Sequence, residues 1–327
     1  MALLIKFDKN KQAIAVSPAA REICSMTVRR LRDAPWLRVR LKSDPAYAHT
    51  ARTLRQGGLH TVCEEALCPN RHECWSHGTA TFMIMGDVCT RNCNFCNVSG
   101  GHRPLPLDAD EPLRLAHAAA RMNLHYVVLT SVTRDDLPDG GAEHFGQTVD
   151  ALREALPTAG IELLTPDFHR CEEQALETLS QRGPLIWGHN LETVPRLYAS
   201  ARTGADYARS LRLLERIAKI GSGIEAKSAL MLGLGESREE IRAVLKDLLA
   251  VGCRRLAVGQ YLRPTSKHLP VEEYLKPETF AEIEDEARTM GFTGVRAGPL
   301  VRSSYLADLA SGETVINETV ANKAREE

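Results

Sequence analysis

The sequence predicts an α/β fold in which crossover helices cover a parallel sheet. Six short apolar runs, each bounded by turn residues, are typical of strands, and segments long enough for helices lie between them. Strands that alternate with helices pair in parallel through right-handed connections. Two architectures satisfy this pattern, a (β/α)6 partial barrel and an open doubly wound sheet. The periodicity alone does not choose between them.

The predicted strands cover residues 81–85, 126–132, 161–165, 185–187, 227–232 and 256–261. The clearest helix is predicted over residues 237–251, where leucine, isoleucine and valine recur on one helical face. Ser237 and Glu240 form a capping box at its start, and Gly252 is expected to end it.

Polar or glycine-bearing segments follow five of the predicted strands. They are Thr130-Ser131, Thr165-Pro166-Asp167, His189-Asn190, Gly233-Leu234-Gly235-Glu236 and Gly259-Gln260. The C-terminal ends of parallel strands line the ligand site in both architectures. Any one of these segments is explained by an ordinary loop, but five together indicate a binding site at this edge of the sheet.

The composition is that of a globular protein, with 43% apolar and 25% charged residues in 327. This length fits either two domains or a single barrel. Lys plus Arg (41) nearly balances Asp plus Glu (42), which gives no preference for nucleic acid. No run approaches the about 18 apolar residues that span a bilayer, and the N-terminal stretch is charged too soon for a signal peptide. We expect a cytoplasmic protein that binds neither nucleic acid nor membrane.

Six of the nine cysteines lie between Cys63 and Cys96. So many thiols in a short stretch of a large cytosolic chain favour metal binding over a disulfide framework. The other three, Cys24, Cys171 and Cys253, are scattered and are expected to be unliganded.

Cys89, Cys93 and Cys96 form a C-x3-C-x2-C motif directly after the first predicted strand. Thiolates suit iron–sulfur clusters, and three ligands for four irons leave one iron open to bind something else. The alternative is structural zinc, which needs four protein ligands. No second cysteine pair stands at zinc spacing, and His102 is the only histidine shortly downstream.

Cys63, Cys68 and Cys74 form a second trio, with x4 and x5 spacing. A zinc knuckle needs a different interval, and His72 does not supply it. Three thiolates again suggest a cluster, with a fourth ligand from elsewhere. By spacing alone, three buried and inert thiols remain an alternative.

The first trio resembles the signature of the radical S-adenosylmethionine superfamily, and Phe95 supplies the aromatic residue found before its last cysteine. In that superfamily the open iron of a 4Fe–4S cluster chelates S-adenosylmethionine, and reductive cleavage gives a 5′-deoxyadenosyl radical. The resemblance implies a (β/α)6 partial TIM-type barrel.

Longer stretches, from about residue 35 to residue 308, resemble the lipoyl synthase family within that superfamily. The stretches lie at residues 63–70, 73–82, 86–91, 130–141, 164–168, 189–196, 233–236, 259–262 and 302–305. The last of them reads Arg302-Ser303-Ser304-Tyr305.

The resemblance implies a second, auxiliary 4Fe–4S cluster on Cys63, Cys68 and Cys74, with a serine oxygen as the fourth ligand. Ser304 is the first choice for that ligand and Ser303 the second; without the resemblance, both would read as a helix N-cap. The implied reaction inserts sulfur at C6 and C8 of a protein-bound octanoyl-lysine, with the auxiliary cluster as the sulfur donor.

Strand-end position makes six polar residues candidates for holding S-adenosylmethionine. They are Thr130, Ser131, Asn190, Glu192, Lys227 and Gln260. Each has an alternative interpretation as a polar loop residue or, for Lys227, as a solvated surface charge. No catalytic residue is predicted beyond the cluster ligands.

The implied organisation is an N-terminal extension over 1–75, a radical S-adenosylmethionine core over 76–295 and a C-terminal extension over 296–327. The implied partners are an octanoylated carrier (glycine cleavage H protein or a 2-oxoacid dehydrogenase E2 lipoyl domain), a ferredoxin or flavodoxin as electron donor, and an iron–sulfur carrier that rebuilds the auxiliary cluster.

The chain departs from the family pattern at Gly188, Thr203 and Ala229, none of which is a predicted cluster ligand. The competing hypotheses are another sulfur-inserting radical enzyme, similar to biotin synthase or a methylthiotransferase, and a zinc-stabilised binding module.

Overall fold

One curved sheet, in the order β1-β2-β5-β6-β7-β8-β9-β10, organises the part of the chain that the structure describes. The computed structural model describes residues 34–39, 44–76, 79–183 and 185–305. Cys24 and the end of the C-terminal extension lie outside these ranges. The strands of this sheet are β1 (His60–Thr61), β2 (Thr81–Ile84), β5 (Tyr126–Ser131), β6 (Gly160–Leu164), β7 (Leu185–Gly188), β8 (Ile224–Leu232), β9 (Arg255–Gln260) and β10 (Gly294–Gly298).

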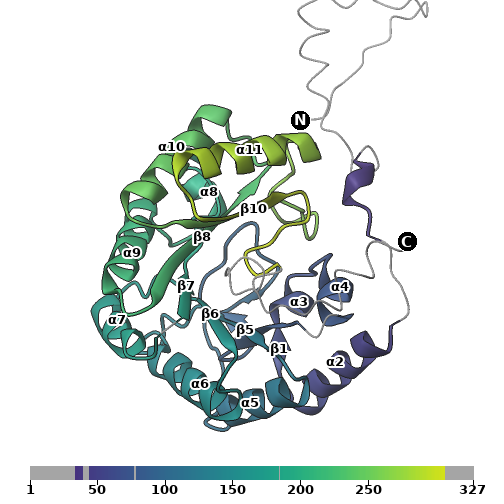
Figure 1. Cartoon of the computed structure of the whole chain (residues 1–327), viewed down its shortest axis with the longest axis vertical. Helices are drawn as coiled ribbons and strands as arrows, with labels where there is room; N and C mark the ends of the chain where they lie inside the picture. The colour runs from purple at the N-terminus through teal and green to yellow at the C-terminus, as the bar shows by residue number, and fades with distance from the viewer. Residues whose placement is uncertain (1–33, 40–43, 77–78, 184, 306–327) are drawn as a thin grey trace, which may run out of the picture.

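The long helices lie along the outer side of this sheet, and the strands form an arc inside them, whereas the short α3 and α4 lie on the inner side of the arc (Figure 1). The main helices are α2 (Pro45–Gln56), α5 (Glu111–Arg121), α6 (Ala142–Ala155), α7 (Glu172–Ser180), α9 (Tyr207–Ile220), α10 (Arg238–Ala250) and α11 (Pro277–Met290). The shorter elements are η2 (Pro35–Leu37), α3 (Val62–Glu65), α4 (Arg71–Ser76), η3 (Pro195–Leu197) and α8 (Tyr198–Ala201), with β3 (Val88–Cys89) and β4 (Ser99–Gly100) as a separate pair. Helices on one side of a curved sheet give a partial barrel rather than a doubly wound sheet.

All six predicted strands are present and pair in parallel from β2 to β9. The predicted helix is also confirmed as α10, and Ser237 and Glu240 form the expected capping box. The described residues form four further strands that were not predicted: the separate pair β3 and β4, and two strands of the large sheet. The short β1 pairs antiparallel with β2, and β10 pairs in parallel with β9. The predicted division between residues 295 and 296 falls inside β10.

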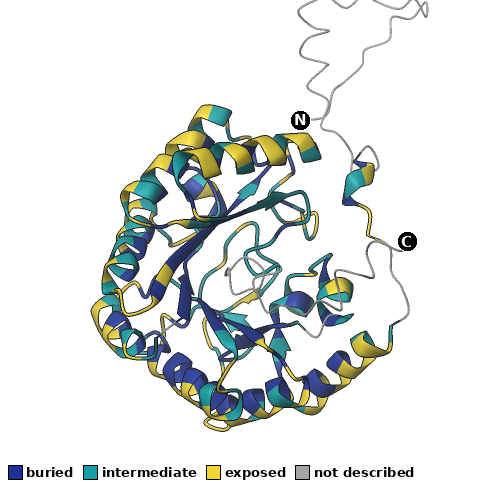
Figure 2. Cartoon of the chain, in the orientation of Figure 1, coloured by how far each residue is buried: buried dark blue, intermediate teal, exposed yellow. Residues whose placement is uncertain are grey.

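The two faces of the sheet differ in polarity because strand residues alternate between them. The outward face packs against the helices in the main hydrophobic core, with residues such as Leu129, Leu163 and Val258. The inward face carries two small clusters of apolar residues together with the buried charges of Glu162 and Lys227. Figure 2 shows the buried inner sides and exposed outer sides of the helices. None of the described helices has both the length and the apolar character needed to cross a bilayer.

The chain after β10 turns back over the sheet and comes close to β9 at Gly259. A Cβ atom at this position would lie 2.0 Å from the carbonyl oxygen of Val301, so only glycine permits the approach. The Nδ2 of Asn70 also donates to the carbonyl of Leu300 at 2.6 Å. These two contacts bring residues 302–305 to the inner side of the barrel, beside the cysteines.

Candidate metal-cluster site

The first cysteine trio lies on the loop that follows β2, at the C-terminal end of the strands. Cys89 belongs to β3, and its Sγ accepts hydrogen bonds of 3.4 Å from the backbone N–H groups of Arg91 and Thr133. A turn brings Cys96 back over Cys93, with the N–H of Cys96 donating to the carbonyl of Cys93 at 3.0 Å. Cys89 affects the pKa of Cys93, and both affect that of Cys96, so the three thiols lie near one another at the barrel mouth.

Burial governs the protonation of this trio. It raises the pKa of Cys96 to about 12, and it raises the pKa of Cys93, where the positive charge of Arg202 acts in the opposite direction. Without a metal, both thiols therefore stay protonated at neutral pH. Because cluster ligands are thiolates, loading a cluster must release protons here.

The second trio lines a cavity together with residues from the far end of the chain. The lining includes Cys63, Cys68, Cys74 and Ser304. Burial raises the pKa of Cys63 to about 11 and that of Cys74 to about 12. Three thiols and one hydroxyl around a common space match the donor set that the resemblance implies for an auxiliary cluster.

The neighbouring serines Ser303 and Ser304 face different sites. The Oγ of Ser304 accepts a hydrogen bond of 2.8 Å from Thr81 and lies in the cavity of the second trio. The hydroxyl of Ser303 donates instead to Oδ1 of Asn190 at 3.1 Å. Of the two serines, the geometry therefore favours Ser304 as the oxygen ligand.

Within the described ranges, no three His, Cys, Asp or Glu side chains converge on the position of a single metal ion. Structural zinc draws four ligands onto one centre, whereas the thiolates of an iron–sulfur cluster each bind a different iron. Thiols spread around a loop and around a cavity suit the cluster better than the zinc alternative.

Asn190 and Glu192 lie together at the end of β7, close to the first trio. The Nδ2 of Asn190 donates to Oε1 of Glu192 at 3.0 Å, and Glu192 has a left-handed backbone with φ of 70°. Burial raises the pKa of Glu192, which Arg202 and Asn190 counteract. The carboxylate is close enough to Cys93 and Cys96 to affect the pKa of both thiols. The structure thus brings these two predicted residues to the cysteine loop.

The other predicted S-adenosylmethionine contacts divide into free and occupied side chains. The Oγ of Ser131 is buried and has no hydrogen-bond partner among the described residues. Thr130 donates to the carbonyl of Leu164 at 2.8 Å. The amide of Gln260 donates to three backbone carbonyls and accepts from the N–H of Leu275. Thr130 and Gln260 are therefore already committed to holding the backbone.

Lys227 is 4% exposed, so its interpretation as a solvated surface charge is wrong. Its Nζ lies 2.7 and 2.8 Å from the two carboxylate oxygens of the fully buried Glu162. The hydroxyl of Tyr126 donates to the same carboxylate at 3.1 Å. Lys227 is the fourth residue of β8 and lies well before the strand's C-terminal end. The geometry gives it a structural partner inside the barrel.

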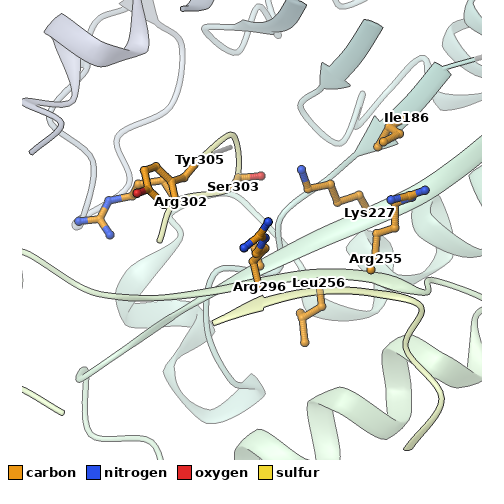
Figure 3. A pocket seen from close by; sticks show the side chains of 10 residues that line it. Ile186, Lys227, Arg255, Leu256, Arg296, Arg302, Ser303 and Tyr305 are labelled. Atoms are coloured by element: carbon orange, nitrogen blue, oxygen red, sulfur yellow. The ribbon is translucent and has the colours of Figure 1, made fainter. Parts of the chain in front are cut away.

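A second cavity lies inside the barrel between β8, β9, β10 and the C-terminal segment. Figure 3 shows Lys227 and Arg296 extending into it beside Ser303. Since Ser303 also contacts Asn190, this cavity adjoins the S-adenosylmethionine candidates. Arg302 and Tyr305 line both this cavity and that of the second trio.

Sequence reasoning missed Arg202. The positive charge of this side chain acts to lower the pKa of both Cys93 and Glu192. Sequence reasoning also missed the role of Asp167, although it singled out the segment that contains this residue. Asp167 is fully buried and accepts from Arg91 at 2.6 Å and from Arg209 at 2.9 Å. Burial alone would raise the pKa of Asp167, but the hydrogen bond and charge of Arg91 hold it well below its usual range. This ion pair ties the cysteine loop to the loop after β6.

Comparison with known proteins assigns the family. The sequence model of the Radical SAM superfamily matches residues 83–248. A protein named lipoyl synthase from Coxiella burnetii (strain Dugway 5J108-111) is 53% identical over 87% of this chain and 90% of its own length. Another from Methylococcus capsulatus is 53% identical over 85% of this chain and 86% of its own length. A lipoyl synthase from Chlorobium phaeovibrioides is 49% identical over 86% of this chain and 99% of its own length. The chain belongs to the lipoyl synthase family.

Two solved structures of other proteins share the fold of this chain. The FeFe-hydrogenase maturase HydG from Carboxydothermus hydrogenoformans has a TM-score of 0.52 at 15% identity, over 65% of this chain and 52% of that one. Streptococcus suis SuiB has a TM-score of 0.51 at 12% identity, over 85% of this chain and 60% of that one. At such identities the likeness shows only the fold, and it confirms the predicted partial barrel for this lipoyl synthase family member.

Proposed function

We propose that this protein inserts two sulfur atoms, at C6 and C8, into an octanoyl group carried on a lysine of a lipoyl carrier protein. Membership of the lipoyl synthase family makes it an enzyme that uses S-adenosylmethionine and 4Fe–4S clusters. The observation that carries the residue-level proposal is the meeting of Ser304 with Cys63, Cys68 and Cys74 around one cavity. The 49–53% identity to lipoyl synthases over most of the chain favours this function over the biotin synthase-like and methylthiotransferase-like alternatives.

In this proposal Cys89, Cys93 and Cys96 hold the first cluster, and the second trio with Ser304 holds the auxiliary cluster. When bound, the first cluster and S-adenosylmethionine supply a radical that removes hydrogen from an unactivated carbon, and the auxiliary cluster supplies sulfur. The chain's own contribution is to hold these groups apart by fixed loops and to keep water out of a reaction of such reactivity. The contacts of Gly259 and Asn70 serve this by fixing the C-terminal segment between them.

Arg202 and the pair Asn190–Glu192 are proposed to hold S-adenosylmethionine. The Nη1 of Arg202 donates to the carbonyl of Asn190 at 2.7 Å and to the hydroxyl of Tyr198 at 2.6 Å. Its Nε is buried and has no partner among the described residues. A guanidinium edge left free in this way matches a carboxylate, which the amino acid part of S-adenosylmethionine presents.

The partners follow from this reaction. We infer that the substrate is glycine cleavage H protein or an E2 lipoyl domain, that a ferredoxin or flavodoxin supplies electrons, and that an iron–sulfur carrier rebuilds the auxiliary cluster.

An anaerobic assay with an octanoylated lysine peptide tests the function. Protein loaded with both clusters should release 5′-deoxyadenosine and yield a peptide heavier by two sulfur atoms, as measured by mass spectrometry. The Cys68→Ala variant should still cleave S-adenosylmethionine but add no sulfur. A full yield of dithiolated product from that variant contradicts the proposed sulfur source.

A further inference from the structure

A chain of hydrogen bonds runs through the barrel wall from the buried His189 to Arg202. Nδ1 of His189 lies 2.9 Å from the carbonyl oxygen of Thr165, and Nε2 lies 3.1 Å from the hydroxyl of Ser210. The hydroxyl of Tyr198 donates to Ser210 at 2.9 Å and accepts from Arg202 at 2.6 Å. This series of hydrogen bonds joins the end of β7 to α9 and α8.

The direction of every hydrogen bond in this chain is fixed by its first member. A carbonyl oxygen only accepts, so the proton of neutral His189 must be on Nδ1, and Nε2 must accept. Ser210 then donates to Nε2, and its oxygen is left to accept from Tyr198. The oxygen of Tyr198, having used its proton, presents a lone pair to Arg202.

The environment of His189 keeps this direction constant. The side chain is 1% exposed, and burial, followed by the charge of Arg202, lowers the pKa of His189 to about 4. The imidazole is therefore neutral across the neutral pH range, and its Nε2 stays an acceptor.

Arg202 is held on one side only. Its Nη1 donates to both Tyr198 and Asn190, and its guanidinium lies 5.2 Å from the ring centroid of Tyr198. The Nε edge is buried and has no partner in the described part of the chain. A side chain fixed by one edge and free at the other is oriented for a ligand.

We propose that His189, Ser210 and Tyr198 are positioning residues that orient Arg202 toward the carboxylate of S-adenosylmethionine. The inference rests on the proposed function in one respect, the role of Arg202. It goes beyond that function because none of the three touches the cofactor, and each acts through the next.

The test replaces Tyr198 by Phe, which removes the hydroxyl but keeps the ring beneath Arg202. Affinity for S-adenosylmethionine is measured by equilibrium binding to anaerobic, cluster-loaded protein, beside KM and kcat for 5′-deoxyadenosine release. Because hydrogen bonds to charged groups are strong, Tyr198→Phe should weaken binding about tenfold, with the change in KM rather than kcat.

Tyr207→Phe is the matched control. The ring of Tyr207 packs edge-on against that of Tyr198, with 5.4 Å between the ring centroids. The hydroxyl of Tyr207 donates to Asp247 and takes no part in the hydrogen bonds that lead to Arg202. Binding by this variant should match that of the wild type. Equal weakening in both variants would mean a general packing defect and would overturn the proposal.

A double variant separates failure of the inference from failure of the proposed function. Arg202→Lys should weaken binding by itself, and adding Tyr198→Phe should then change little, since Tyr198 acts through Arg202. Normal binding by Arg202→Lys contradicts the proposed role of Arg202. Weak binding by Arg202→Lys with normal binding by Tyr198→Phe contradicts only the positioning chain.

A measurement without cofactor checks the direction of the chain. Nitrogen-15 NMR of labelled histidine, with His189→Asn to assign the resonance, should show neutral His189 with the proton on Nδ1 at pH 7. A proton on Nε2, or a charged ring, would overturn the proposal.

Discussion

Ser303 and Ser304 are adjacent in the sequence, yet their side chains serve two different sites. Ser304 lies with the second cysteine trio and accepts from Thr81, while Ser303 donates to Asn190 beside the first trio. This division makes residues 302–305 the link between the two candidate cluster sites. Replacing each serine should therefore have a different, measurable effect.

Ser304→Ala should damage the auxiliary cluster and leave S-adenosylmethionine cleavage largely intact. Losing a ligand should lower sulfur insertion by at least about tenfold, because changing even a side chain that only supports a metal ligand costs about 10- to 100-fold. The matched variant, Ser303→Ala, should keep its full iron content and change S-adenosylmethionine affinity instead. Iron analysis beside mass spectrometry of the peptide distinguishes them, and identical losses in the two variants would contradict the division.

Replacing Cys89, Cys93 or Cys96 with Ala should abolish 5′-deoxyadenosine release under dithionite, because three thiolates are needed to hold the first cluster. Cys171→Ala is the control, since this cysteine belongs to neither trio, and it should behave as wild type. Normal release by any of the three variants would refute the assignment of the first trio.

The helices and strands were predictable because their signals are local. The six strands and α10 follow from apolar periodicity, and the capping box of Ser237 and Glu240 is visible in four residues. β10 was missed because Gly294–Gly298 contains two glycines and a charge, and it is a strand only because β9 offers a partner.

The side-chain partners within the site were less predictable, because they depend on contacts between distant segments. The sequence offers Lys227 as a candidate S-adenosylmethionine contact, with a solvated surface charge as the alternative. In the structure Glu162, 65 residues earlier, neutralises it inside the barrel. Arg202 carries no motif signal, and only folding brings it beside Cys93 and Glu192. The cytoplasmic location and the division into extensions and core stay predictions.

The ion pair of Glu162 with Lys227 should stabilise the fold rather than bind the cofactor. Glu162→Gln leaves a buried ammonium without its counter-charge, which should cost about 3–5 kcal/mol of unfolding free energy. Combining Glu162→Leu with Lys227→Met should restore most of it, with unchanged S-adenosylmethionine affinity. The exposed pair of Lys219 with Glu215 provides the control, and Lys219→Ala should cost less than about 1 kcal/mol in urea unfolding. A loss of S-adenosylmethionine affinity in the double variant would show that Lys227 contributes to cofactor binding.

Gly259→Ala should displace the C-terminal segment, because the new Cβ would meet the carbonyl oxygen of Val301 at 2.0 Å. The expected result is loss of sulfur insertion with retained 5′-deoxyadenosine release, as for Ser304→Ala. Gly298→Ala is the matched control, since its Cβ would meet only the side chain of Val301, at 3.2 Å. Full dithiolation by Gly259→Ala would show that this approach does not fix Ser304.

Protonation of His189 should make the fold sensitive to acid. The folded-state pKa of about 4 lies below the ordinary histidine value of 6.5, so above pH 6.5 neither state binds the proton and stability is complete. Between pH 6.5 and about 4, His189 binds a proton in the unfolded chain but not in the folded protein. This difference lowers the free energy of unfolding. The shift corresponds to a loss of about 3 kcal/mol at most.

His189→Asn isolates this contribution in urea unfolding measured from pH 7 to pH 4. Asparagine keeps a donor near the carbonyl of Thr165 but loses the acceptor that Nε2 offers to Ser210, so the variant should be less stable at pH 7. It also has no proton to gain in acid. Its stability should then fall less steeply with acid than that of the wild type. Other carboxylates and histidines titrate equally in both proteins and cancel in the difference. Parallel curves would mean that His189 is protonated in the folded protein as easily as in the unfolded chain, and the direction of the hydrogen-bond chain would then not be fixed by a neutral imidazole.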